Sequence, residues 1–177
     1  MPPHCDSLDG PVVRAARAAL DLEDVDLVLP YVHEPAEVEV RRAFELAVKA
    51  RTQGPEAHEV ADLYFFETVV RVHRAGEGAP FTGLKPAGLD VGPVIPLAER
   101  AIEMGDAAEL AELLATATRD EVMDRFAELM AMKAHAGDDV ASARRYVTAM
   151  LGLQVWAHKL HAAVHTAAHE GGAHVHT

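Results

Sequence analysis

Cysteine is almost absent from this sequence, since Cys5 is the single one among 177 residues. A lone cysteine excludes a disulfide within the chain, so the thiol is free, bound to a ligand or bridged to another chain. Aromatic residues make up only 5% of the chain, while 50% of the residues are hydrophobic, with alanine and leucine used heavily. This composition favours helices packed on helices over a sheet.

Basic residues are also scarce: 16 lysines and arginines stand against 28 acidic residues, a formal net charge of -12. This balance argues against a nucleic-acid partner, which needs clustered basic side chains, and gives no general steering of an anionic substrate. No apolar run reaches the ~18 residues of a membrane-spanning helix, and no secretory signal opens the sequence. We therefore expect a cytoplasmic, soluble protein with a reduced thiol and no membrane partner.

The chain is long enough for one domain with a sizeable core. We expect an all-α helical bundle of about six or seven helices with one long glycine- and proline-rich loop. The bundle domain is assigned to residues 11–165, after a metal-hook-like segment at 1–10 and before a histidine-rich tail at 166–177.

Apolar periodicity, together with proline and glycine, predicts where the helices lie. The expected spans are 11–22, 35–52, 56–75, 97–104, 110–117, 119–136 and 140–170, with a short interrupted helix at 25–32. Thr118 is expected to cap the helix at 119–136, because Glu121 follows it at capping-box spacing. The helix at 56–75 is apolar almost all round, which places it in the centre of the bundle, and the loop at 76–96 then crosses one end.

The densest group of ligand side chains lies near the start, where His4, Cys5, Asp6 and Asp9 follow one another closely. A thiolate beside an imidazole is a strong site for nickel, copper, zinc or iron, so His4, Cys5 and Asp9 are candidate metal ligands. Two alternatives stay open. Cys5 is a free thiol in a poorly ordered terminus, with Asp6 and Asp9 as helix caps, or it is a reactive thiolate without a metal.

Two further candidate ligands, Glu67 and His73, lie on the expected central helix. They are about 120° apart around a helix, so each would meet the N-terminal segment separately rather than share one ion. Glu67 and Arg71 have the spacing of an ordinary helix ion pair, which is the simplest structural role for Glu67.

Histidines recur near the C-terminal end at helical spacing, and a continuous helix would place them in one stripe. These candidate ligands are His158, His161, His165 and His169. Histidine-rich tracts bind metal by composition alone, so weak metal binding, a plain solvated tail and a specific site all remain open.

The run His4-Cys5-Asp6-Ser7-Leu8-Asp9-Gly10 resembles the N-terminal hook of nickel superoxide dismutases, His-Cys-Asp-x-x-Cys-Gly, with Asp9 in place of the second hook cysteine. The resemblance implies a nickel cofactor and redox chemistry on a small oxygen species, with Cys5 as the catalytic thiolate. In that family the metal also takes the free amine of the hook histidine, so the three residues before His4 would have to be removed.

The whole chain, including 64–68 (YFFET) and 73–80 (HRAGEGAP), also resembles an uncharacterised bacterial domain family. That resemblance implies no activity. The sequence therefore predicts a transition-metal-binding helical protein, with redox turnover left open. The alternatives are a metal-storage protein and a non-catalytic helical interaction module, and in each case a homo-oligomer remains open.

Overall fold

The computed structural model describes residues 3–166, and in this part of the chain the protein is all-α, which confirms the expected fold class. The β structure described there is an isolated parallel bridge between Ser7 and Lys85. None of the described helices is long and apolar enough to span a membrane. Contacts divide the chain into two compact units that meet in sequence between Val91 and Gly92. A single bundle domain over 11–165 stays a prediction.

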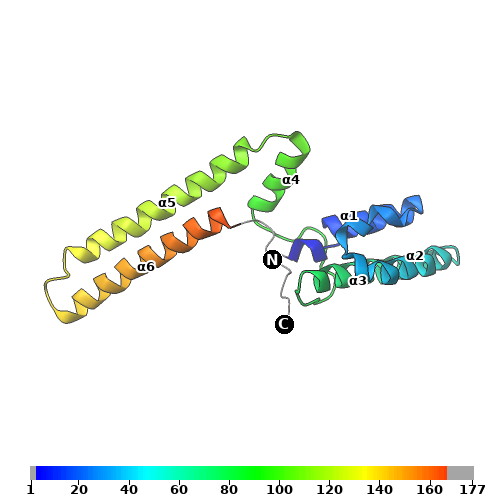
Figure 1. Ribbon diagram of the computed structural model, residues 1–177, viewed down its shortest axis with the longest axis horizontal. Helices are drawn as coiled ribbons and strands as arrows, with labels where there is room; N and C mark the ends of the chain where they lie inside the picture. Colours follow the sequence, from blue (N-terminus) through cyan, green and yellow to red (C-terminus); the bar gives the residue numbers. More distant parts are fainter. Residues whose placement is uncertain (1–2, 167–177) are drawn as a thin grey trace. The chain divides into compact units, whose positions relative to one another are not determined.

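Unit 1 combines three α-helices with short 3₁₀ turns (Figure 1). Its elements are η1 (Pro3–Asp6), α1 (Pro11–Leu22), η2 (Val25–Leu27), η3 (Leu29–Tyr31), η4 (Glu34–Ala36), α2 (Glu37–Arg51) and α3 (Pro55–Gly76). The helix starting at Pro11 agrees with the sequence, since proline suits a first helical position. Between α2 and α3, Gly54 has a φ of 132°, a backbone conformation that favours glycine and permits the tight turn.

The core of unit 1 lies where α3 packs against α1 and α2. Phe65, Phe66, Val69 and Val70 of α3 are fully buried there. The ring of Phe65 meets that of Phe44 of α2 at 5.7 Å between centroids, in a tilted arrangement typical of aromatic pairs. The prediction that this helix is central therefore holds within unit 1.

One part of that prediction is wrong, because α3 is not covered all round. Val60, Leu63 and Tyr64 near its N-terminal end are 43% or more exposed. Two neighbouring helices cover only part of a helix's circumference, so apolar residues on the remaining side stay at the surface.

Unit 2 consists of α4 (Val94–Met104), α5 (Ala108–Lys133) and α6 (Val140–His165). Figure 1 shows α5 and α6 running side by side as a hairpin. The expected break at Thr118 is wrong, because α5 is one continuous helix through that residue. No glycine or proline interrupts 108–136, and a threonine is tolerated inside a helix.

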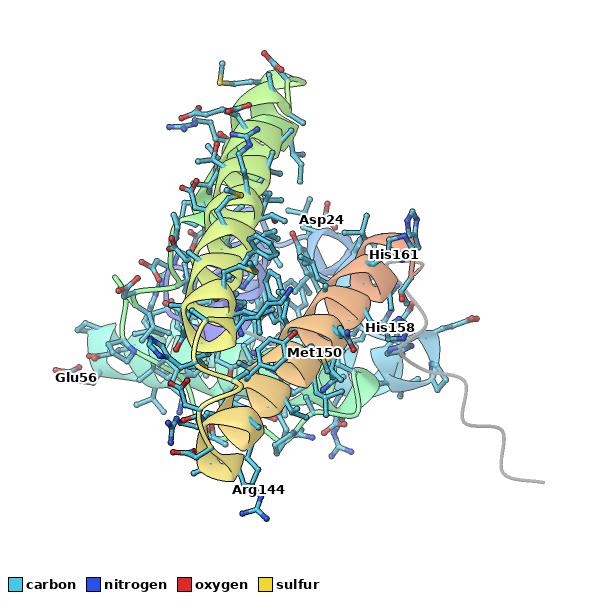
Figure 2. All side chains as sticks on the ribbon, turned by 90° about the vertical axis from the view of Figure 1, so that its left-hand side faces the viewer. Asp24, Glu56, Arg144, Met150, His158 and His161 are labelled. Atoms are coloured by element: carbon cyan, nitrogen blue, oxygen red, sulfur yellow. The ribbon has the colours of Figure 1, made fainter. Side chains whose placement is uncertain are left out.

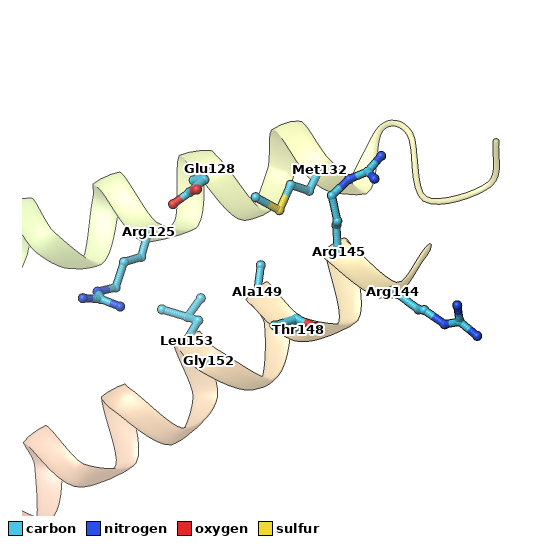
Figure 3. Close-up of a pocket in the computed structure, with 9 residues that line it drawn as sticks. All are labelled: Arg125, Glu128, Met132, Arg144, Arg145, Thr148, Ala149, Gly152 and Leu153. Atoms are coloured by element: carbon cyan, nitrogen blue, oxygen red, sulfur yellow. The ribbon is translucent and has the colours of Figure 1, made fainter. Parts of the chain in front are cut away.

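An open groove of about 470 Å³ lies between α5 and α6 (Figure 3). Met132, Ala149 and Leu153 line it together with charged side chains. Arg125 is paired with Glu121 and lies over the ring of Trp156, while Arg145 donates to Ser142. These two arginines of the groove are thus already engaged by neighbours on the hairpin itself.

Candidate functional site

The N-terminal segment, residues 3–10, is folded back on itself. The Ser7 amide donates to the His4 carbonyl at 3.2 Å, and the Gly10 amide donates to the Ser7 carbonyl at 2.9 Å. A Cβ atom on Gly10 would lie 1.9 Å from the His4 carbonyl oxygen, so only glycine permits this close approach. The segment is therefore a compact turn that leads directly into α1.

A second set of bonds joins this segment to the long loop that follows α3. The Lys85 amide donates to the Asp6 carbonyl at 2.8 Å, the Leu8 amide donates to the Lys85 carbonyl at 3.0 Å, and the Ser7 hydroxyl oxygen lies 3.0 Å from the Pro86 carbonyl oxygen. The expectation for this loop, residues 76–96, is that it crosses one end of the helical bundle. Its residues around Lys85 hold the N-terminal segment in place.

The carboxylate of Asp9 is engaged on both oxygens. Oδ1 accepts from the Ser7 hydroxyl, and Oδ2 accepts from the Gly88 amide at 2.7 Å. The Ser7 hydrogen bond, followed by that from Gly88, lowers the pKa of Asp9 below its ordinary value. Each oxygen keeps a further lone pair, so these bonds fix the orientation of the Asp9 carboxylate without excluding it as a metal ligand.

Asp6 forms a buried ion pair with Arg74, near the C-terminal end of α3. Nε of Arg74 lies 2.6 Å from Oδ1 of Asp6, and the two side chains are 4% and 5% exposed. A second guanidinium nitrogen reaches Glu77 at 3.1 Å. Burial alone would lower the pKa of Arg74, but the hydrogen bond and charge of Asp6, with the charges of Cys5 and Glu77, raise it.

Cys5 lies beside this ion pair and is only 8% exposed. Its Sγ atom is 3.7 Å from Nδ1 of His4, within the range of a weak sulfur hydrogen bond. The alternative of a thiol without a metal stays open, but the expected capping of α1 by Asp6 or Asp9 is wrong. Cys5 is packed, and the N-cap of α1 is Gly10 without a side-chain cap bond.

The two candidate ligands on α3 do not join Cys5. Nδ1 of His73 donates to the Tyr31 carbonyl at 2.8 Å, and Nε2 lies 3.3 Å from Glu77. Glu67 is exposed. The expected ion pair between Glu67 and Arg71 is replaced by one between Arg71 and Glu39 of α2 at 2.6 Å, because packing of α3 on α2 offers a carboxylate across the interface.

The C-terminal histidines lie on a continuous helix, as expected, up to the end of α6. His158, His161 and His165 are exposed there, and Figure 2 shows the first two on α6. His161 and His165 contact each other at 3.1 Å between their Nε2 atoms. His169, the rest of the helix expected to reach 170, and the tail from 167 onward lie outside the described residues.

Taken over residues 3–166, the structure contains no group of three or more histidine, cysteine or acidic side chains arranged around a metal-sized space. Among the predicted ligands in this range, it brings together the pair His4 and Cys5 and the pair His161 and His165. Sequence reasoning missed the role of Arg74 as the partner of Asp6 and that of the Lys85 loop. The available signal was an arginine at the end of the most apolar helix.

The fold and this site define an all-α protein with a packed thiol held between an imidazole and a buried ion pair. The chain belongs to the family described as a family of unknown function (DUF6448), whose model matches residues 9–156. This agrees with the expected uncharacterised family. No curated protein and no solved structure matches the chain.

Proposed function

We propose that the N-terminal segment binds a transition-metal ion through the Cys5 thiolate and the His4 imidazole. The observation that carries this proposal is the 3.7 Å separation of Sγ and Nδ1. With bonds of about 2.3 Å to sulfur and about 2.0–2.1 Å to nitrogen, a tetrahedral ion places these two donors about 3.6 Å apart. The pair therefore needs little movement to chelate such an ion.

One neighbour of Cys5 favours the thiolate form that ligation requires. Arg74 is buried beside it, with its guanidinium also paired to Asp6 and Glu77. The segment is fixed at Gly10 and at Lys85, which pre-positions both donors. Two protein donors leave further positions on the ion for water or another ligand.

A nickel cofactor and superoxide chemistry would be a more specific function for this site. The observation that favours them is the residue order from His4 to Gly10. The remaining nickel ligands of such a hook are harder to supply here. Asp9 offers a harder carboxylate donor where the hook has a second thiolate, and His4 is joined to Pro3 by a peptide bond. A square-planar ion would also bring the two donors to about 3.1 Å. The proposal is therefore for an ion that accepts tetrahedral coordination, with zinc or copper(I) preferred.

Metal analysis of untagged protein, together with cobalt(II) titration of the metal-free protein, tests this proposal. We expect a thiolate-to-cobalt charge-transfer band that disappears in Cys5→Ser and weakens in His4→Ala. His158→Gln serves as the matched control and should leave the band unchanged. If wild type and Cys5→Ser carry the same metals and give the same cobalt spectrum, the site is not at Cys5.

A second candidate, a helical interaction module, is favoured by one separate observation on α6. Val140, Val147, Leu151 and Val155 recur at helical spacing on this helix and are 43–65% exposed. Exposed apolar stripes of this kind mark surfaces that meet a partner. Light scattering of wild type and Leu151→Lys would test this candidate. If the chain self-associates through this stripe, the molar mass should be that of an oligomer in wild type and lower in the variant. If both proteins are monomers, a second copy of the chain is not the partner.

A further inference from the structure

The last turn of α6 carries two exposed histidines whose ring nitrogens converge. His161 and His165 are one helical turn apart, with 3.1 Å between their Nε2 atoms and 4.3 Å between ring centroids. These residues lie in unit 2, and the N-terminal site lies in unit 1. The pair therefore uses none of the residues of the thiolate site and lies in the other unit.

We propose that His161 and His165 form a bidentate site for a divalent cation of the copper, nickel and zinc class. With metal to nitrogen bonds of about 2.0–2.1 Å, two donors are about 2.9 Å apart at 90° and about 3.3 Å apart in a tetrahedron. The observed 3.1 Å falls between these values. An ion of either geometry can bind with small rotations of the two rings.

The surroundings define which cations fit. Helix α6, Val140–His165, contains no aspartate or glutamate, so its own side chains offer imidazole nitrogen and no carboxylate oxygen. Imidazole ligands suit copper, nickel and zinc, whereas magnesium and calcium need oxygen donors. We therefore expect copper(II) to bind most tightly, with nickel(II) and zinc(II) following.

The position of the pair on the helix also favours a cation. His165 is the last residue of α6, where the unsatisfied carbonyl groups carry the negative end of the helix dipole. The 3.1 Å contact is a hydrogen bond when one of the two Nε2 atoms of the neutral pair carries the proton and the other accepts it. When a metal takes both Nε2 lone pairs, that proton is transferred through solvent to Nδ1 of the same ring, so the neutral pair releases no net proton.

Nickel(II) titration of the full chain, followed by hydrogen exchange at the last turn of α6, tests this site. A metal that bridges two turns should slow exchange of the amides near Ala162 and His165. We expect this protection to be lost in His161→Gln and in His165→Gln. His158→Gln, on the same helix and equally exposed, should retain it, and magnesium should give no protection.

The titration is repeated in Cys5→Ser, where nickel should protect the last turn of α6 as it does in wild type, so this readout is independent of the N-terminal site. We also expect the double variant His161→Gln/His165→Gln to bind one nickel equivalent fewer per chain. Unchanged stoichiometry in the double variant would assign binding to other histidines and overturn the proposal. Equal loss of protection in His158→Gln would overturn it as well.

Discussion

At the scale of single residues, Arg74 has the largest predicted effect on stability. Removing one partner of a buried ion pair leaves the other charge unpaired, so Arg74→Met should destabilise unit 1 by about 3–5 kcal/mol. Arg71→Met is the matched control. Its partner is Glu39 and the two side chains are 45% and 54% exposed, so its loss should cost less than about 1 kcal/mol. Hydrogen exchange of α3 core amides measures both, and equal effects would contradict the assignment.

Gly10 tests whether the compact turn matters for the thiolate site. In Gly10→Ala the new Cβ would collide with the backbone of His4, so the turn must open and the positions of His4 and Cys5 must change. We expect weaker cobalt binding in this variant. Gly137→Ala is the control, since a Cβ there meets nothing within 4 Å. Wild-type cobalt affinity in Gly10→Ala would show that this turn does not position the donors.

Asp9 gives the N-terminal segment a specific pH dependence. Its pKa is lowered from 3.8 by the Ser7 and Gly88 hydrogen bonds, so the folded state favours the carboxylate. The stabilisation is therefore complete above the unfolded value near 3.8 and is lost as the pH falls through the lowered pKa. In an NMR titration the Gly88 amide should move with a midpoint below 3.8, and Asp9→Asn should abolish that transition. A midpoint at or above this value would contradict the assignment.

At the scale of elements, the start of α6 depends on Asp139. Its carboxylate accepts from the Ser142 amide at 2.7 Å and so satisfies one of the free donors at the N-terminus of the helix. Asp139→Ala should destabilise α6 by about 1 kcal/mol, while Asp139→Ser should retain most of the cap. Asp138→Ala removes a neighbouring charge without removing the cap. Exchange rates in the first turns of α6 would distinguish the three variants.

The helices themselves show how far local sequence patterns reach. Pro11 at the start of α1 and Gly54 before α3 were correct guides to boundaries, because both residues act through local backbone geometry. Thr118 was a misleading guide, since a capping box forms only where a helix begins and α5 runs through it. A capping-box sequence therefore predicts a helix terminus only where the residues before it are not themselves helical.

At the scale of the whole molecule, the net charge of -12 should oppose compaction. Salt screens this repulsion, as the Debye length falls from ~30 Å at 0.01 M to ~8 Å at 0.15 M ionic strength. Exposed ion pairs also weaken in salt, but each contributes less than about 1 kcal/mol. We therefore expect the melting temperature to rise over this range in sodium chloride. A fall would mean that surface ion pairs outweigh the repulsion.

The sequence by itself determined the all-α class, most helix spans and the pairing of His4 with Cys5, because helical periodicity and neighbouring residues are local properties. Only the tertiary structure decided that Asp6 meets Arg74, 68 positions away, that the Lys85 loop holds the N-terminal segment, and that Arg71 binds Glu39 rather than Glu67. Such contacts depend on which helix faces pack together. The packing of helix faces depends on how much apolar surface the whole unit can bury. It cannot be deduced from the spacing of residues within any one segment.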